Sequence, residues 1–186
     1  MWFLFVKYND LKAMRKIGYL SLVIISLCFL NSCKKVEQIS GVPHIEYTSF
    51  TIFDTTDILG NISKGGRLKF HFEDGDGDLG LDAPSPNSTQ TDSTNLFFTL
   101  FRKEGGVMVA APDNDPLKPS PYRIPYMERL GQNKILKGTI SVTFLYLFYS
   151  TADTIRYDFY IKDRALNESN VVSTNEIELA VNNTYK

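Results

Sequence analysis

The residues of this chain whose types and spacing favour a specific chemistry are the carboxylates of one acidic turn. Asp74, Asp76 and Asp78 occupy every second position, with Gly75 and Gly77 between them. Three carboxylates in so short a turn repel one another unless a cation lies among them. Calcium binds six to eight oxygen atoms, and glycine lets the backbone bend so that carbonyl groups reach such an ion. The turn therefore favours a calcium site, and an ordinary Asp/Gly turn without an ion is the alternative.

The turn does not match an EF-hand loop, so it needs ligands from elsewhere in the fold. An EF-hand has glycine at its sixth position and glutamate at its twelfth, where this chain has Leu79 and Ser85. Acidic and amide side chains recur after a later apolar segment, in residues 162–170. The predicted metal ligands are Asp74, Asp76, Asp78, Asp163 and Asn167.

The elements that must position these ligands are β-strands, because apolar residues alternate with polar ones along most of the chain. Leu68, Phe70 and Phe72 are an example, and in a strand such alternation gives one buried face and one wet face. The predicted strands are 45–53, 67–73, 96–102, 135–148, 154–162 and 171–181, with weaker strand material in 107–127, including 123–127. No segment after residue 43 predicts an amphipathic helix.

About seven short strands in roughly 140 residues are typical of an all-β, immunoglobulin-like sandwich. In that fold the loops after the predicted strands 67–73 and 154–162 lie at the same pole, which would bring residues 74–78 and 162–170 together. The predicted core consists of Leu68, Phe70, Phe72, Leu100, Ile140, Val142, Phe144, Tyr157, Phe159, Ile161, Ile177 and Leu179.

The beginning of the chain predicts a secretory signal peptide over residues 1–32, helical before cleavage. Basic residues follow Met14, which we expect to be the true start, and a predominantly apolar stretch of 14 residues occupies 17–30. That stretch is shorter than the roughly 20 residues that a membrane-spanning helix needs. Leu30-Asn31-Ser32-Cys33 resembles a bacterial lipobox, which implies cleavage before Cys33 and lipidation of its sulfur. Residues 33–43 would then be a lipidated tether and residues 44–186 the sandwich domain.

Charge and cysteine content exclude several classes of protein. The first 32 residues hold four of the 20 basic and one of the 21 acidic residues, which leaves the mature chain with a net charge of −4. Such a balance argues against nucleic acid as a partner. Cys28 would leave with the signal peptide and Cys33 would carry lipid, so disulfides, zinc–thiolate sites and cysteine nucleophiles are excluded.

Two segments resemble immunoglobulin-like domains of Bacteroidota envelope lipoproteins. The first runs from Phe72 to Gly80 and contains the acidic turn; the second runs from Tyr157 to Asn170, with Leu166 at a position where glycine is usual. The resemblance implies the fold and a location in the cell envelope. Lys34 and Lys35 after Cys33, in place of aspartate, favour transfer to the outer membrane. The resemblance does not imply an activity, because fold alone does not set function.

Three functions remain open at this stage. The first is a lipid-anchored, non-catalytic binding or structural module, stabilised by calcium, whose partner is an envelope protein or a glycan. The second is a carbohydrate-binding accessory lipoprotein of a polysaccharide-uptake system, which would use exposed aromatic residues among Phe97, Phe101, Tyr122, Tyr126, Tyr149 and Tyr160. The third is an enzyme, although neither His44 nor His71 lies beside a nucleophile motif. A pocket with two close carboxylates of raised pKa would favour the enzyme.

Overall fold

The computed structural model describes residues 39–83, 94–128 and 134–186, which belong to one compact unit. Cys33, Ser85 and most of the predicted signal and tether lie outside these residues. Within the described part, no helix has the length and apolar character needed to cross a membrane.

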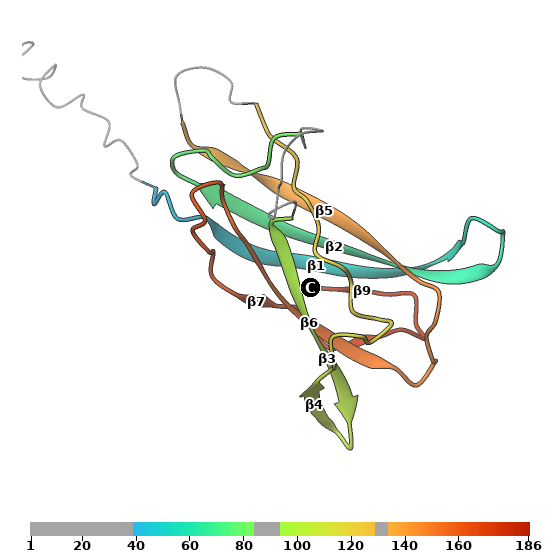
Figure 1. Ribbon diagram of the computed structural model, residues 1–186. Coiled ribbons are helices and arrows are strands. Elements are labelled where there is room, and N and C mark those ends of the chain that lie inside the picture. The colour runs from blue at the N-terminus through green and yellow to red at the C-terminus, as the bar shows by residue number, and fades with distance from the viewer. Residues whose placement is uncertain (1–38, 84–93, 129–133) are drawn as a thin grey trace, which may run out of the picture. The chain divides into compact units, whose positions relative to one another are not determined.

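The described residues form strands and no helix. The strands are β1 (His44–Thr56), β2 (Ile62–Asp74), β3 (Leu96–Glu104), β4 (Val107–Ala110), β5 (Leu136–Tyr146), β6 (Thr154–Ile161), β7 (Val172–Ser173), β8 (Ile177–Glu178) and β9 (Thr184–Tyr185). The alternating segments of the sequence are therefore strands, as predicted. β1 and β2 are longer than predicted because they continue as a two-stranded hairpin toward the turn at 57–61 (Figure 1).

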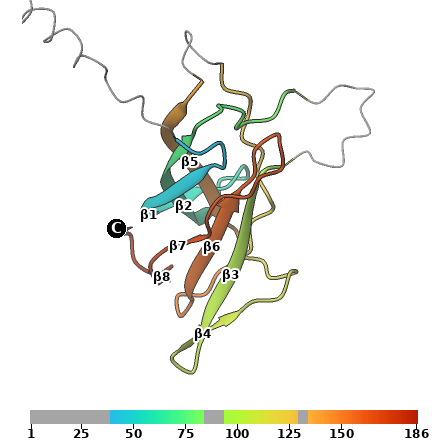
Figure 2. The ribbon, with the colours of Figure 1, turned by 90° about the vertical axis from the view of Figure 1, so that its left-hand side faces the viewer.

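The strands form two antiparallel sheets packed as a sandwich (Figures 1 and 2). One sheet has the order β5-β2-β1-β9, and the other has the order β4-β3-β6-β7, with β8 also pairing with β6. β2 and β6, which correspond to the predicted strands 67–73 and 154–162, each lie between two other strands of their sheet, as in an immunoglobulin-like sandwich. The predicted all-β fold is confirmed.

The core lies between the two sheets and contains the predicted residues. Eleven of the twelve are buried; Ile140 is only half-buried. Phe70 from β2 and Phe159 from β6 meet across the sandwich with ring centroids 5.3 Å apart. Two-sheet packing buries both rings because each occupies the inward position of its strand.

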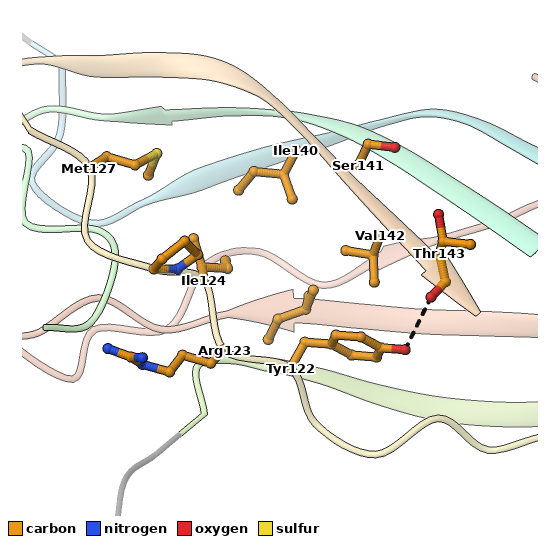
Figure 3. Close-up of a pocket in the computed structure, with 10 residues that line it drawn as sticks. Tyr122, Arg123, Ile124, Met127, Ile140, Ser141, Val142 and Thr143 are labelled. Carbon is orange, nitrogen blue, oxygen red and sulfur yellow. Dashed lines mark hydrogen bonds between the residues drawn. The ribbon is translucent and has the colours of Figure 1, made fainter. Parts of the chain in front are cut away.

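The predicted strand at 123–127 is wrong. Its segment makes only isolated bridges, from Tyr122 to Leu96 and from Pro125 to Leu81. Proline has no N–H to donate to a strand ladder, and a proline inside the segment prevents regular pairing. The segment instead runs along β5 and leaves an apolar cleft of about 420 Å³ between Ile124, Met127, Ile140 and Val142 (Figure 3). This cleft is the reason why Ile140 is incompletely buried.

The predicted final strand, 171–181, is interrupted by a bulge. β7 pairs Ser173 with Asp158, whereas β8 pairs Ile177 with Ile155, so the chain gains one residue between the two pairings. Thr174 lies at the bulge, where its hydroxyl accepts a hydrogen bond from the N–H of Tyr157 at 3.1 Å. β9, which the sequence pattern did not predict, adds a short edge to β1.

Candidate metal centre

Strand geometry buries the first residue of the acidic turn. Leu68, Phe70 and Phe72 occupy inward positions of β2, and Asp74 is the next inward position, at the end of the strand. Its relative exposure is 0%, as in the apolar core. A carboxylate removed from water needs hydrogen bonds or a counter-charge, because desolvation otherwise makes the ionised form costly.

The backbone of the turn gathers three carboxylates. Gly77 has a φ of 67°, a left-handed conformation that favours glycine, and the N–H of Leu79 donates to Asp74 Oδ2 at 2.8 Å. One oxygen each of Asp74, Asp76 and Asp78 lies within 4.8 Å of the other two. Distances of this kind are compatible with ligands that share one ion.

Two buried oxygens of this group have no hydrogen-bond partner among the residues that the structure describes. They are Oδ1 of Asp74 and Oδ1 of Asp78. Buried polar atoms are nearly always hydrogen-bonded in folded proteins, so an unpaired carboxylate oxygen beside another is a sign of a missing ligand. The second oxygen of Asp74 is held by Leu79, which fixes the orientation of the carboxylate.

The electrostatics of the group show uncompensated negative charge. Burial, together with the neighbouring carboxylates of Asp76 and Asp78, raises the pKa of Asp74 to about 6. Burial also raises the pKa of Asp78, and the charges of Asp163 and Asp76 act in the same direction. The Arg164 guanidinium opposes this rise at Asp78 without cancelling it. A dication among the carboxylates would reverse both shifts.

The loop after β6 reaches this turn, as the immunoglobulin-like topology predicts. The N–H of Arg164 donates to the carbonyl of Asp78 at 3.3 Å, and its guanidinium donates to the carbonyl of Gly80 at 3.0 Å. Leu166, at the position where glycine is usual in the similar domains, has a φ of 68°. The tight turn is therefore present with leucine in a left-handed conformation.

Asp163 and Asn167 lie in this loop, but their side chains bond each other. The two carboxylate oxygens of Asp163, which is buried, accept from the N–H and the Nδ2 of Asn167, each at 2.8 Å. The group with ligand atoms within 4.8 Å consists of Asp74, Asp76 and Asp78 and does not include Asp163. Asp163 acts on the group through its charge, and its role as a ligand, with that of Asn167, stays a prediction.

The sequence analysis missed a third segment at the turn, the end of the predicted tether. The N–H of Gly75 donates to the carbonyl of Ser40 at 2.8 Å. A Cβ on Gly75 would lie 2.2 Å from the carbonyl oxygen of Ile39, and a Cβ on Gly41 would lie 2.9 Å from a carboxylate oxygen of Asp76. Both glycines therefore permit close contact between the segment and the turn, and the glycines are the signal that could have revealed it.

The donor set fits a hard dication. The group offers carboxylate oxygens only, which suit calcium and magnesium rather than zinc or copper. Three carboxylates supply fewer than the six to eight oxygens that calcium takes, so backbone carbonyls, Asp163 or water would complete the shell. Calcium tolerates such irregular shells better than magnesium does.

Two clefts among the described residues, of about 420 and 400 Å³, are lined by other residues than this group. The raised carboxylate pKa values of Asp74 and Asp78 therefore belong to a turn at the edge of the core and not to either cleft. His44 and His71 lie on the polar side of β1 and β2, where each imidazole approaches a glutamate, Glu46 or Glu73, at 3.8 and 3.9 Å.

Comparison of the chain with protein-family models, with curated proteins and with solved structures finds no match. The functional argument consequently depends on the residues and the geometry described above.

Proposed function

We propose that this chain is a lipid-anchored, non-catalytic module of the bacterial cell envelope whose sandwich domain is stabilised by a calcium ion at the turn 74–78. The observation that carries the calcium part is the buried carboxylate of Asp74, with one unpaired oxygen, beside Asp76 and Asp78. The sequence pattern around Leu30–Cys33 supports the lipid anchor on Cys33, and Lys34 and Lys35 after it support the outer-membrane location.

The position of the turn gives the ion a structural role. The turn joins the end of β2, the loop after β6 and the end of the segment that leads to Cys33. An ion at this point would neutralise the repulsion among the carboxylates and hold the three segments together. The domain would thereby be stiffened where it meets its proposed anchor.

The calcium proposal is tested by thermal unfolding with calcium and with chelator. Extracellular modules bind calcium with dissociation constants of about 10⁻⁴–10⁻³ M, so millimolar calcium is the appropriate condition. At a hundredfold excess over the dissociation constant the ion would stabilise the folded state by about 2.7 kcal/mol. We expect a higher Tm in calcium, a smaller increase in magnesium, and loss of the increase in Asp76→Asn.

Asp82→Asn is the matched control, since Asp82 is an exposed aspartate close to the turn but outside the group of three. It should keep the full response to calcium. Equal Tm values in calcium and in chelator for the unmodified protein would contradict the proposal, and the acidic turn would then be only a turn.

A second pair of variants decides whether Asp163 is a ligand. Asp163→Ala and Asn167→Ala both remove the side-chain bond between the two residues, so both lower the stability in chelator. Calcium titration separates their roles: a ligand role for Asp163 predicts a much weaker affinity in Asp163→Ala than in Asn167→Ala, which keeps the carboxylate of Asp163. Similar affinities in both variants would restrict the site to Asp74, Asp76, Asp78 and groups other than Asp163.

A further inference from the structure

A second feature of the molecule shares no residue with the metal centre. It is a cleft of about 400 Å³ over the outer face of the β3–β6 pair. Phe97, Thr99 and Tyr160 line it from the sheet, and Asp113, Lys118 and Ser120 line it from the loop that follows β4. Its volume lies in the range of about 300–1,000 Å³ that is typical of small-molecule sites.

The floor of the cleft is an aromatic pair that the core does not use. Phe97 and Tyr160 are direct cross-strand partners, and their rings stack with centroids 5.1 Å apart and planes inclined by 20°. The inward positions beside them belong to Phe98 and Phe159, which form the core. The half-buried outer rings therefore present apolar surface on the outward face of the sheet, next to the ammonium of Lys162, which lies 5.3 Å from the ring centroid of Phe97 and 6.0 Å from that of Tyr160.

The loop side of the cleft supplies polar groups of both signs. The ammonium of Lys118 pairs with the carboxylate of Asp113, which is almost fully exposed. Ser120, together with Thr99 on the sheet, adds hydroxyl groups that donate and accept hydrogen bonds. The side chains that line the cleft carry one positive and one negative charge, and the ammonium of Lys162 beside the two rings is paired with Glu168 at 2.9 Å. This balance does not favour a strongly charged ligand.

The loop is held in place by buried contacts, so the cleft exists before any ligand binds. The guanidinium of Arg102 on β3 donates to both carboxylate oxygens of Asp115, at 2.6 and 2.8 Å. The hydroxyl of Tyr157 on β6 donates to the carbonyl of Leu117 at 2.7 Å. Within this loop, the rings of Pro119 and Pro121 each fix one backbone dihedral, φ. A preformed site loses less conformational freedom on binding.

We propose that this cleft binds a neutral saccharide. The C–H groups of a sugar ring carry partial positive charge and pack on the negative faces of aromatic rings, here those of Phe97 and Tyr160. Sugar hydroxyls would donate to the carboxylate of Asp113 and accept from the ammonium of Lys118. The proposal is independent of the calcium site, because the cleft uses none of its residues.

The test is a glycan array followed by affinity gel electrophoresis of the full chain, with α-glucan, β-glucan, mannan and xylan as the neutral probes. We expect retardation by at least one of these polysaccharides. Phe97→Ala and Tyr160→Ala should each weaken binding about tenfold or more, the loss typical of an aromatic residue at the centre of an interface. Tyr160→Phe should retain binding, because it keeps the ring.

Phe101→Ala is the matched control. Phe101 lies on the same strand and the same face as Phe97, contacts Arg156, and does not line the cleft. It should leave the affinity unchanged. The proposal is overturned if no neutral glycan binds, or if Phe101→Ala weakens binding as much as Phe97→Ala does. It is also overturned if only anionic glycans bind and this binding depends on Lys118 and falls with salt. Glycan binding is measured both with calcium and with chelator, so that a failure of the saccharide proposal can be distinguished from a failure of the calcium proposal.

Discussion

At the scale of single residues, Asp74 is the position where strand geometry and side-chain chemistry conflict. The alternation that buries Phe70 and Phe72 also buries this carboxylate, which keeps one hydrogen bond, from Leu79, and one unpaired oxygen. An apolar residue would fill this inward position without the free-energy cost of burying a charged group. The proposed ion would explain the presence of an acid here, because it needs the negative charge.

The raised pKa of Asp74 gives a pH dependence with a definite sign. In the folded, ion-free protein this carboxyl has a pKa of about 6, above its ordinary value near 4. The unfolded chain therefore loses this proton first, and the contribution of the protonated group to stability disappears as the pH rises from about 4 through about 6. The loss is at most about 3 kcal/mol, because one pKa unit corresponds to about 1.4 kcal/mol.

Chemical denaturation in chelator measures this loss. Asp74→Asn should remove it and should be more stable than the unmodified protein at neutral pH without calcium. Calcium binding has the opposite dependence, because the ligand must be deprotonated. The calcium affinity at pH 5 should be about tenfold weaker than at pH 7, and an affinity that does not change between these values would exclude Asp74 as a ligand.

At the scale of elements, β6 connects the core to the cleft. Its inward residues Tyr157 and Phe159 are fully buried, and the hydroxyl of Tyr157 continues past the core to the loop after β4 and lies 3.1 Å from that of Tyr146. The same strand thus fixes the packing of the two sheets and the position of the loop that walls the cleft.

Tyr157→Phe tests the link between core and loop. The substitution keeps the ring but leaves the carbonyl of Leu117 without its donor, and a buried unsatisfied acceptor costs about 1–3 kcal/mol. We expect a loss of that size in the free energy of unfolding and faster amide exchange in residues 113–121. A fall in stability with unchanged exchange in this loop would show that the hydroxyl does not hold the loop.

Phe159→Ala tests the sandwich core. The ring is fully buried against Phe70 and Phe98, so its removal should lower the free energy of unfolding by about 3–5 kcal/mol. Phe101→Ala, on the outward face of the paired strand β3, is the matched control and should cost much less. Equal costs for the two variants would contradict the assignment of inward and outward faces.

At the scale of the whole molecule, the proposed anchor and the proposed ion site are related through residues 39–43. This end of the predicted tether is bonded to Gly75 and is not free chain. A lipid on Cys33 would therefore be only a few residues from a fixed point on the domain. Three acyl chains, each contributing about 0.8 kcal/mol per buried methylene group, would hold the protein firmly in a bilayer.

Cys33→Ala tests the anchor. The variant should lose labelling by radioactive fatty acid and should appear as uncleaved precursor or as soluble protein. Cys28→Ala is the control, since that residue lies within the predicted signal peptide. Unchanged labelling and membrane fractionation in Cys33→Ala would contradict the lipoprotein proposal.

The sequence by itself determined the fold class, most of the core and the three clustered carboxylates, since each depends on local patterns. A period of two assigns Phe70 and Phe159 to a buried face, and spacing within one turn brings Asp74, Asp76 and Asp78 together. Only the tertiary structure decided features that depend on contacts between distant segments. One such feature is the side-chain hydrogen bond between Asp163 and Asn167, two residues that the sequence pattern predicts as metal ligands. The others are the hydrogen bond from Gly75 to Ser40 and the cleft lined by Phe97 and Lys118. A local pattern states which face a side chain occupies, but it does not state which loop arrives opposite that face.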